Sequence, residues 1–93
     1  MNLFISICCD HHIDEVVRVF STPEKAVEYC KEFALDEKPE EQELTQLMIR
    51  KGWIYFATYG EGNSVRVEKS TLIILFQRWS FTRIARMVFE SSL

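Results

Sequence analysis

The 93-residue sequence has few of the residues that interrupt regular structure, with only three glycines and two prolines. Hydrophobic residues make up 47% of the chain and charged residues 27%, a balance typical of a folded domain and not of a disordered chain. We expect one domain over residues 1–93, large enough to bury a core without disulfide bonds or a structural metal. No apolar run exceeds five residues, which is too short to cross a bilayer, so we expect no membrane association.

The chain also lacks the short motifs of common enzymes: the phosphate-binding loop, the dinucleotide glycine motif, the nucleophile elbow and the paired histidines of zinc proteases. The stretch with Gly60 and Gly62 precedes a predicted strand, so it indicates a hairpin turn and not a phosphate cradle. His11 or His12 could pair with a cysteine as base and nucleophile, but nothing in the sequence orients them. We therefore expect a protein that is not an enzyme and that has no cofactor.

The three cysteines, Cys8, Cys9 and Cys30, are an odd number. Cys8 and Cys9 are adjacent in a predicted strand and point to opposite faces, so they pair poorly. This favours a reduced protein of the cytoplasm. Cys8, Cys9, Asp10 and the two histidines after it are zinc-type ligands, but adjacent residues diverge on a strand, and we expect no metal.

Two β-hairpins are predicted. The segments 2–9 and 16–20 flank a polar tip, and both faces of the first segment are apolar, as in a central strand. The segment Trp53–Tyr59 is rich in aromatic residues and precedes a Gly-Glu-Gly-Asn turn. The return strand is expected to run to Phe76, with a bulge near Lys69–Thr71; a helix from Ser70 is the alternative.

Three helices are predicted, over about 22–35, 39–51 and 80–91. Ser21 is the expected cap of the first, with Glu24 three residues later. Gly52 is placed to end the second, whose expected inner residues include Leu44, Leu47 and Met48. The predicted fold is α+β, with a four-stranded, mainly antiparallel sheet and helices packed on one face, in the order β-β-α-α-β-β-α.

Charge is distributed unevenly along the chain. Residues 1–45 contain eleven acids and four bases, whereas residues 46–93 contain three acids and seven bases. Acids four residues apart line one helical face and repel one another, which a basic partner would relieve. The main hypothesis is a protein-binding module whose acidic helix faces meet another protein, such as a nucleic-acid-binding one. Its predicted binding residues are Glu24, Glu28, Glu32, Asp36, Glu37, Glu40, Glu41 and Glu43.

The second half of the sequence supports an alternative, a nucleic-acid-binding accessory protein. Aromatic residues that can stack on bases lie among its basic residues. The sequence pI of about 5.3 argues against it. The candidate nucleic-acid residues are Arg66, Lys69, Arg78, Arg83 and Arg86. The twelve aromatic residues also indicate a surface for a partner or for self-association into a homo-oligomer.

The segments 19–26 (Val-Phe-Ser-Thr-Pro-Glu-Lys-Ala) and 63–69 (Asn-Ser-Val-Arg-Val-Glu-Lys) resemble small accessory proteins of phages and mobile elements. The resemblance covers about half of the chain. It implies a viral inhibitor of host defence, similar to anti-CRISPR proteins, that acts in the host cytoplasm by binding a protein. It implies no catalytic residues.

Overall fold

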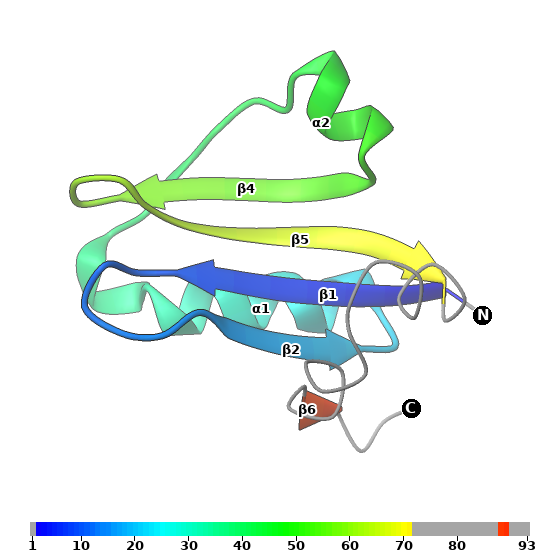
Figure 1. Cartoon of the computed structure of the whole chain (residues 1–93), viewed down its shortest axis with the longest axis horizontal. Coiled ribbons are helices and arrows are strands. Elements are labelled where there is room, and N and C mark those ends of the chain that lie inside the picture. Colours follow the sequence, from blue (N-terminus) through cyan, green and yellow to red (C-terminus); the bar gives the residue numbers. More distant parts are fainter. Residues whose placement is uncertain (1, 72–87, 90–93) are drawn as a thin grey trace.

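The structure is a computed structural model that describes residues 2–71 and 88–89 (Figure 1). Five antiparallel strands form a sheet in the order β3-β4-β5-β1-β2, and a two-residue strand, β6, lies parallel to β2. The elements are β1 (Asn2–Cys9), β2 (Val16–Phe20), α1 (Pro23–Phe33), the 3-10 turn η1 (Leu35–Glu37), β3 (Glu40–Glu41), α2 (Gln46–Arg50), β4 (Trp53–Tyr59), β5 (Asn63–Thr71) and β6 (Val88–Phe89). The predicted α+β class is confirmed, but the sheet has more strands than the four expected.

Both predicted hairpins are present, and β1 is the central strand. It pairs with β5 along all eight of its residues and with β2 on its other side. With neighbours on both sides and apolar residues on both faces, β1 is largely buried, as its sequence pattern predicts; only Asn2 is exposed. Leu3, Ile5, Ile7 and Val19 form a cluster that is at most 2% exposed. These residues alternate with the positions of β1 and β2 that face α1, so they belong to the opposite face of the sheet.

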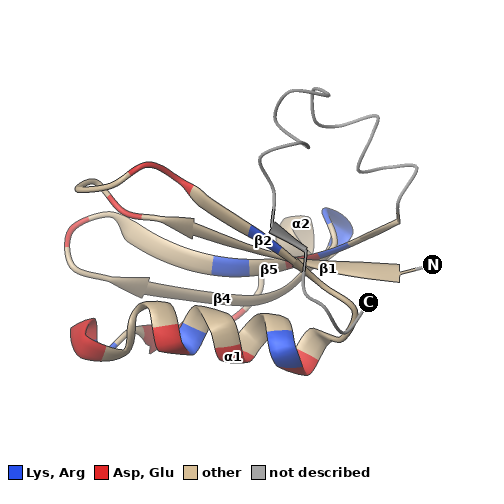
Figure 2. Ribbon diagram, turned by 90° about the horizontal axis from the view of Figure 1, so that it is seen from below, with Lys and Arg blue, Asp and Glu red and all other residues tan. Residues whose placement is uncertain are grey.

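Helix α1 covers one face of the sheet, across β1, β2 and β5 (Figure 2). Its buried residues, Ala26 and Cys30, pack into the main core cluster. The hydroxyl of Ser6 in β1 donates a hydrogen bond of 2.7 Å to the carbonyl oxygen of Ala26, which joins the sheet to the helix inside the core. The predicted cap is off by one residue, since Thr22 accepts from the Lys25 amide and Pro23 begins the helix.

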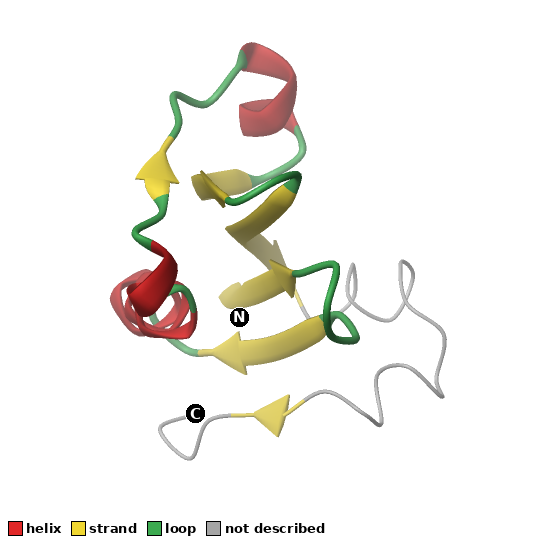
Figure 3. Cartoon of the chain, turned by 90° about the vertical axis from the view of Figure 1, so that its left-hand side faces the viewer, coloured by secondary structure: helices red, strands yellow, loops and turns green. Residues whose placement is uncertain are grey.

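The second predicted helix is wrong over its first half. Glu40 and Glu41 form β3 and pair with Thr58 and Ala57 of β4, so this segment is a fifth strand (Figure 3). Pairing satisfies more backbone groups here than an isolated helical turn rich in acids would. Only Gln46–Arg50 is helical, because the Thr45 side chain caps it at the Met48 amide. Leu47 is 60% exposed, so it does not belong to an inner stripe.

Gly52 ends α2 as predicted. It has a φ of +88°, and the preceding residue, Lys51, is the helix cap. A Cβ at Gly52 would lie 2.8 Å from the backbone oxygen of Lys69, closer than such atoms approach. Glycine is therefore required both by the left-handed backbone and by the contact with β5.

The irregularity expected in β5 occurs instead in β4. β5 pairs regularly with β1 as far as Thr71, which excludes a helix from Ser70, whereas the register between β4 and β5 shifts between Trp53 and Tyr55. The shift changes the face on which Trp53 lies. Alternation predicts that Trp53 shares a face with Tyr55, but its ring packs on Phe56, with ring centroids 5.3 Å apart. Tyr55 packs against the core cluster on the α1 side.

The final predicted elements lie mostly outside the described residues. The strand to Phe76 is described only as far as Thr71, and of the helix over 80–91 only Val88 and Phe89 are described. Those two residues are in β6, paired with Arg18 and Val19, so they are strand and not helix.

Candidate protein-binding surface

Three of the predicted binding residues lie on the outer side of α1. Glu24, Glu28 and Glu32 are exposed because the opposite side of the helix is buried in the core. They are spaced by four residues, so successive carboxylates lie about 6 Å apart along the helix axis. Like charges at this spacing destabilise a helix by a few tenths of a kcal/mol per pair. The outer side of α1 therefore carries a row of acids whose mutual repulsion slightly destabilises the helix.

The chain then turns back and brings further acids beside α1. After η1, Lys38 adopts a left-handed conformation with a φ of +50°, and β3 follows. The Lys31 ammonium on α1 lies 3.6 Å from the Glu41 carboxylate in β3, which places the two elements side by side. Glu37 and Glu40 line one cleft of about 280 Å³ together with Tyr59.

All eight predicted residues are exposed, and three consecutive elements carry seven of them. We call this set the acidic face. Within residues 2–71, Lys31–Glu41 is the one ion pair formed by any member of the set. Both of its side chains are more than half exposed, and such a pair contributes little to stability. The acidic face consists of Glu24, Glu28, Glu32, Asp36, Glu37, Glu40, Glu41 and Glu43.

Two further acids adjoin the acidic face: Asp10, which the sequence indicated only as a zinc-type ligand, and Glu61, which it did not indicate as a functional residue. Asp10 and Glu61 lie in the tips of the two hairpins, and both line a cleft of about 560 Å³ with Glu37. Figure 2 shows the acidic hairpin tips at the same end of the molecule as the end of α1. In the sequence these residues are far apart and read as ordinary turn residues, so no local signal could have found them.

Asp10 is held in place by two hydrogen bonds. The His12 backbone amide donates to one carboxylate oxygen at 2.9 Å, and the Tyr59 hydroxyl donates to the other at 2.8 Å. These two donors lower the pKa of Asp10 below its ordinary value, with the His12 amide the larger cause. Burial and the Asp10 carboxylate raise the pKa of the Tyr59 hydroxyl. Asp10 is therefore ionised, and the cleft carries negative charge.

Of the candidate metal ligands near β1, Cys9, Asp10 and His11 line one pocket, whereas Cys8 lies on the other face of the sheet. Cys8 is buried on the α1 side, and its hydrogen bond with Cys30 and its burial raise the pKa of the Cys8 thiol. His11 and His12 are exposed in the hairpin loop. In the described part of the chain, no group of three or more histidine, cysteine or acidic side chains is arranged to hold a metal ion.

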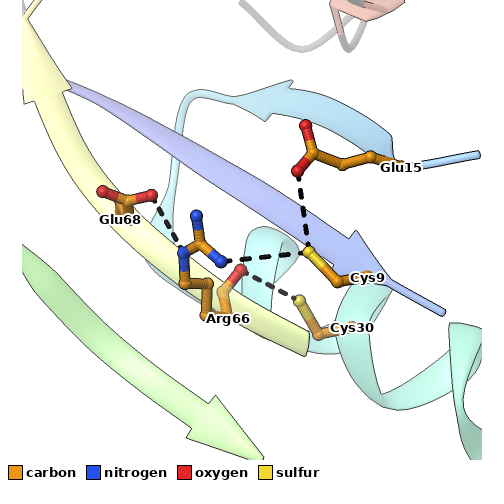
Figure 4. A network of polar contacts seen from close by, with 5 residues as sticks. All are labelled: Cys9, Glu15, Cys30, Arg66 and Glu68. Carbon is orange, nitrogen blue, oxygen red and sulfur yellow. Dashed lines mark hydrogen bonds and ion pairs between the residues drawn. The ribbon is translucent and has the colours of Figure 1, made fainter. Parts of the chain in front are cut away.

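Cys9 is the one cysteine that is partly exposed, and Figure 4 shows it between Glu15 and Arg66. Its thiol donates to the Glu15 carboxylate at 3.6 Å, and the Arg66 guanidinium lies 4.0 Å from its sulfur. Cys30 donates to the backbone oxygen of Arg66 at 3.5 Å. His11 lines one pocket with Cys9, but no hydrogen bond joins their side chains among the described residues.

The alternative, nucleic-acid surface has less support in the described residues. Arg66 donates to Glu68 at 3.1 Å and lies over the Trp53 ring, 4.9 Å from its centroid. Its side chain is only 19% exposed, so it is engaged inside the protein and not offered to a phosphate. Lys69 is exposed. Arg78, Arg83 and Arg86 lie outside the described residues.

Comparisons of the chain with family models, with curated proteins and with solved structures found no match. The resemblance to small proteins of phages and mobile elements stays a prediction. Among the described residues, no helix combines the length and apolar content that crossing a bilayer requires.

Proposed function

We propose that this protein is a small, non-enzymatic binding module that docks on a basic surface of another protein through its acidic face. The observation that carries the proposal is the exposure of all eight acids with a single weak ion pair among them in the described part of the chain. Selection for folding alone does not favour such a surface, because each like-charged pair on α1 is unfavourable. A partner rich in lysine and arginine would relieve the repulsion on binding.

The chemistry of the partner follows from the spacing and the sign of these charges. Carboxylates at about 6 Å intervals present regularly spaced negative charge, as a nucleic-acid backbone does. A protein groove built to bind nucleic acid carries complementary lysine and arginine side chains and attracts such a surface from a distance. A nucleic-acid-binding host protein is therefore the proposed partner, and inhibition by occupying its groove is the proposed consequence, consistent with an anti-CRISPR-like role.

The test is affinity purification from cells of the organism that encodes the chain, followed by mass spectrometry. The bait is compared with a Glu28→Lys/Glu32→Lys variant and with a matched control, Asp14→Lys/Glu15→Lys, which makes the same change in net charge at two exposed acids of the first hairpin loop, outside the acidic face. We expect a basic protein that the wild type and the control retain and that the α1 variant loses. Circular dichroism checks that all three chains are folded.

Two outcomes would contradict the proposal. One is equal retention of every captured protein by the wild type and by the α1 variant. The other is equal loss in both charge-reversed variants, which would show that binding depends on overall charge and not on the acidic face.

A further inference from the structure

A groove lies beside the first two turns of α1, on the face of the sheet that the helix covers. It has a volume of about 520 Å³ and is bounded by α1 on one side and by β4 on the other. Its apolar residues are Pro23, Val27 and Ile54, and its rim carries charged side chains of α1. The lining residues are Pro23, Glu24, Val27, Glu28, Lys31 and Ile54.

The groove is open because β3 is short. β3 pairs with β4 only at Ala57 and Thr58, and one further bond runs from the Gln42 amide to the Phe56 oxygen at 2.9 Å. The chain then leaves the sheet for α2, so the beginning of β4 is an edge among the described strands. An open edge presents backbone groups on which another extended chain can pair.

The register shift in β4 places one of the three apolar residues, Ile54, in the groove. Because the shift falls between Trp53 and Tyr55, Ile54 has no partner residue on β5 among the described pairs. Ile54 lines the groove with Val27 and remains 38% exposed, a large apolar side chain left in contact with water. Burying such a side chain against a partner is favourable because it removes apolar surface from water.

The charge of the rim indicates what the groove binds. Lys31 is paired with Glu41, so its charge is offset within the protein. Glu24 and Glu28 form no ion pair within residues 2–71. The rim is therefore negative above an apolar floor, and it complements a segment with an apolar residue between cations.

We propose that this groove is the docking site for an extended segment of the partner protein, in which an apolar side chain has lysine or arginine two residues to either side, on the same face of the segment. The segment lies along the open edge of β4, places its apolar side chain against Ile54 and Val27, and pairs its cations with Glu24 and Glu28. This inference depends on the proposed function, because it assigns part of the acidic face to the recognition of one segment.

The test uses three fluorescein-labelled heptapeptides in low salt. The first has valine at its centre, lysine two residues to either side and threonine elsewhere, so that the valine and both lysines share one face of the extended chain. The second replaces valine by serine, and the third replaces both lysines by glutamate. Binding is measured by fluorescence anisotropy and mapped by chemical-shift changes in the ¹⁵N-labelled protein. We expect the first peptide to bind more tightly than either of the others, with the largest shifts at Val27, Glu28 and Ile54.

A pair of matched variants tests whether peptide binding requires the groove or only an exposed apolar side chain. Ile54→Ser removes the apolar contact in the groove, and Leu35→Ser removes an even more exposed apolar side chain, at 68%, in η1. We expect Ile54→Ser to weaken binding of the lysine–valine peptide at least tenfold and Leu35→Ser to leave it unchanged. Neither residue belongs to a buried core cluster, and thermal melting checks that both variants fold.

Equal binding of the lysine–valine and lysine–serine peptides, with no effect of Ile54→Ser, would overturn the groove as docking site while leaving the acidic face as a charged surface. Shifts centred on the cleft of Asp10 and Glu61 would overturn it as well. Light scattering that shows a dimer, which Ile54→Ser separates into monomers, would assign the groove to a second copy of the chain instead. The affinity purification tests the proposed function independently of these results.

Discussion

The pair formed by Arg66 and Glu68 allows a quantitative prediction about stability. Glu68 is 1% exposed and Arg66 is 19% exposed, so the 3.1 Å contact between them is largely shielded from water. Figure 4 shows Arg66 and Glu68 within their polar network. Arg66 also lies over the ring of Trp53. Replacing Arg66 with Met keeps an unbranched, mostly apolar side chain but removes the guanidinium that pairs with the buried Glu68 carboxylate.

The cost follows from the burial of both groups. Removing one partner of a buried ion pair destabilises a protein by about 3–5 kcal/mol, and the partial exposure of Arg66 places this case near the lower end. Loss of the contact with the Trp53 ring adds about 0.5–1 kcal/mol. We therefore expect Arg66→Met to lower the free energy of unfolding by about 3–4 kcal/mol, a large share of the 5–15 kcal/mol typical of small domains.

Urea unfolding, followed by tryptophan fluorescence and circular dichroism, measures the effect. With a slope of about 1–3 kcal/mol per molar urea, the midpoint falls by about 1–4 M. The double variant Arg66→Met/Glu68→Leu removes both charges, and we expect it to recover about 2 kcal/mol relative to the sum of the single changes. The control is Lys69→Met, a neutralised exposed cation in the same strand, with an expected change within about 0.5 kcal/mol.

The reasoning fails if Arg66→Met unfolds at the same urea concentration as Lys69→Met. That result would mean that Arg66 is not needed by Glu68 and is available to an external ligand, and it would favour the nucleic-acid alternative. If the double variant loses as much unfolding free energy as the two single variants lose together, the two charges do not act as a pair.

Three further predictions concern other positions. Gly52→Ala should destabilise the protein by about 1–3 kcal/mol in thermal or urea unfolding, since its positive φ and the 2.8 Å approach to the Lys69 oxygen both oppose a Cβ; an unchanged midpoint would contradict this. Because the pKa of Asp10 is lowered, its ionised form stabilises the protein above pH 3.8, the ordinary pKa, and this stabilisation is lost as the pH falls further. Asp10→Asn should therefore flatten the acid side of the curve of stability against pH, and Tyr59→Phe should do so in part. A thiol reagent should label Cys9 rapidly in the native protein and the two buried cysteines only on unfolding, and rapid labelling of all three would refute their burial.

The hairpins and α1 could be predicted because their signals are local. Alternation in the segments 2–9 and 53–59 specifies strands, and a cap, a proline and apolar residues at helical spacing specify α1. Gly52 could also be predicted, since ending a helix requires only its own backbone freedom. Each of these features depends on residues a few positions apart in the chain.

The wrong predictions concern residues whose local structure depends on pairing with distant segments of the chain. Glu40 and Glu41 have a helical pattern of charge but pair with β4, which lies more than 15 residues later in the chain. The face on which Trp53 lies depends on its register with β5, which a strand's own sequence does not specify when both of its faces are apolar. Ile54 consequently appeared to be an ordinary strand residue.

For the candidate site, the sequence alone determined that α1 has an outer row of acids, because an amphipathic helix must expose its polar side. Only the tertiary structure decided which other charges join that row. It brings β3 beside α1, where Glu41 meets Lys31 at 3.6 Å, and it places Asp10 and Glu61 in one cleft with Glu37. The periodicity of a helix or strand specifies which way a side chain faces, whereas its neighbours across the fold depend on strand pairing between segments that are far apart in the sequence.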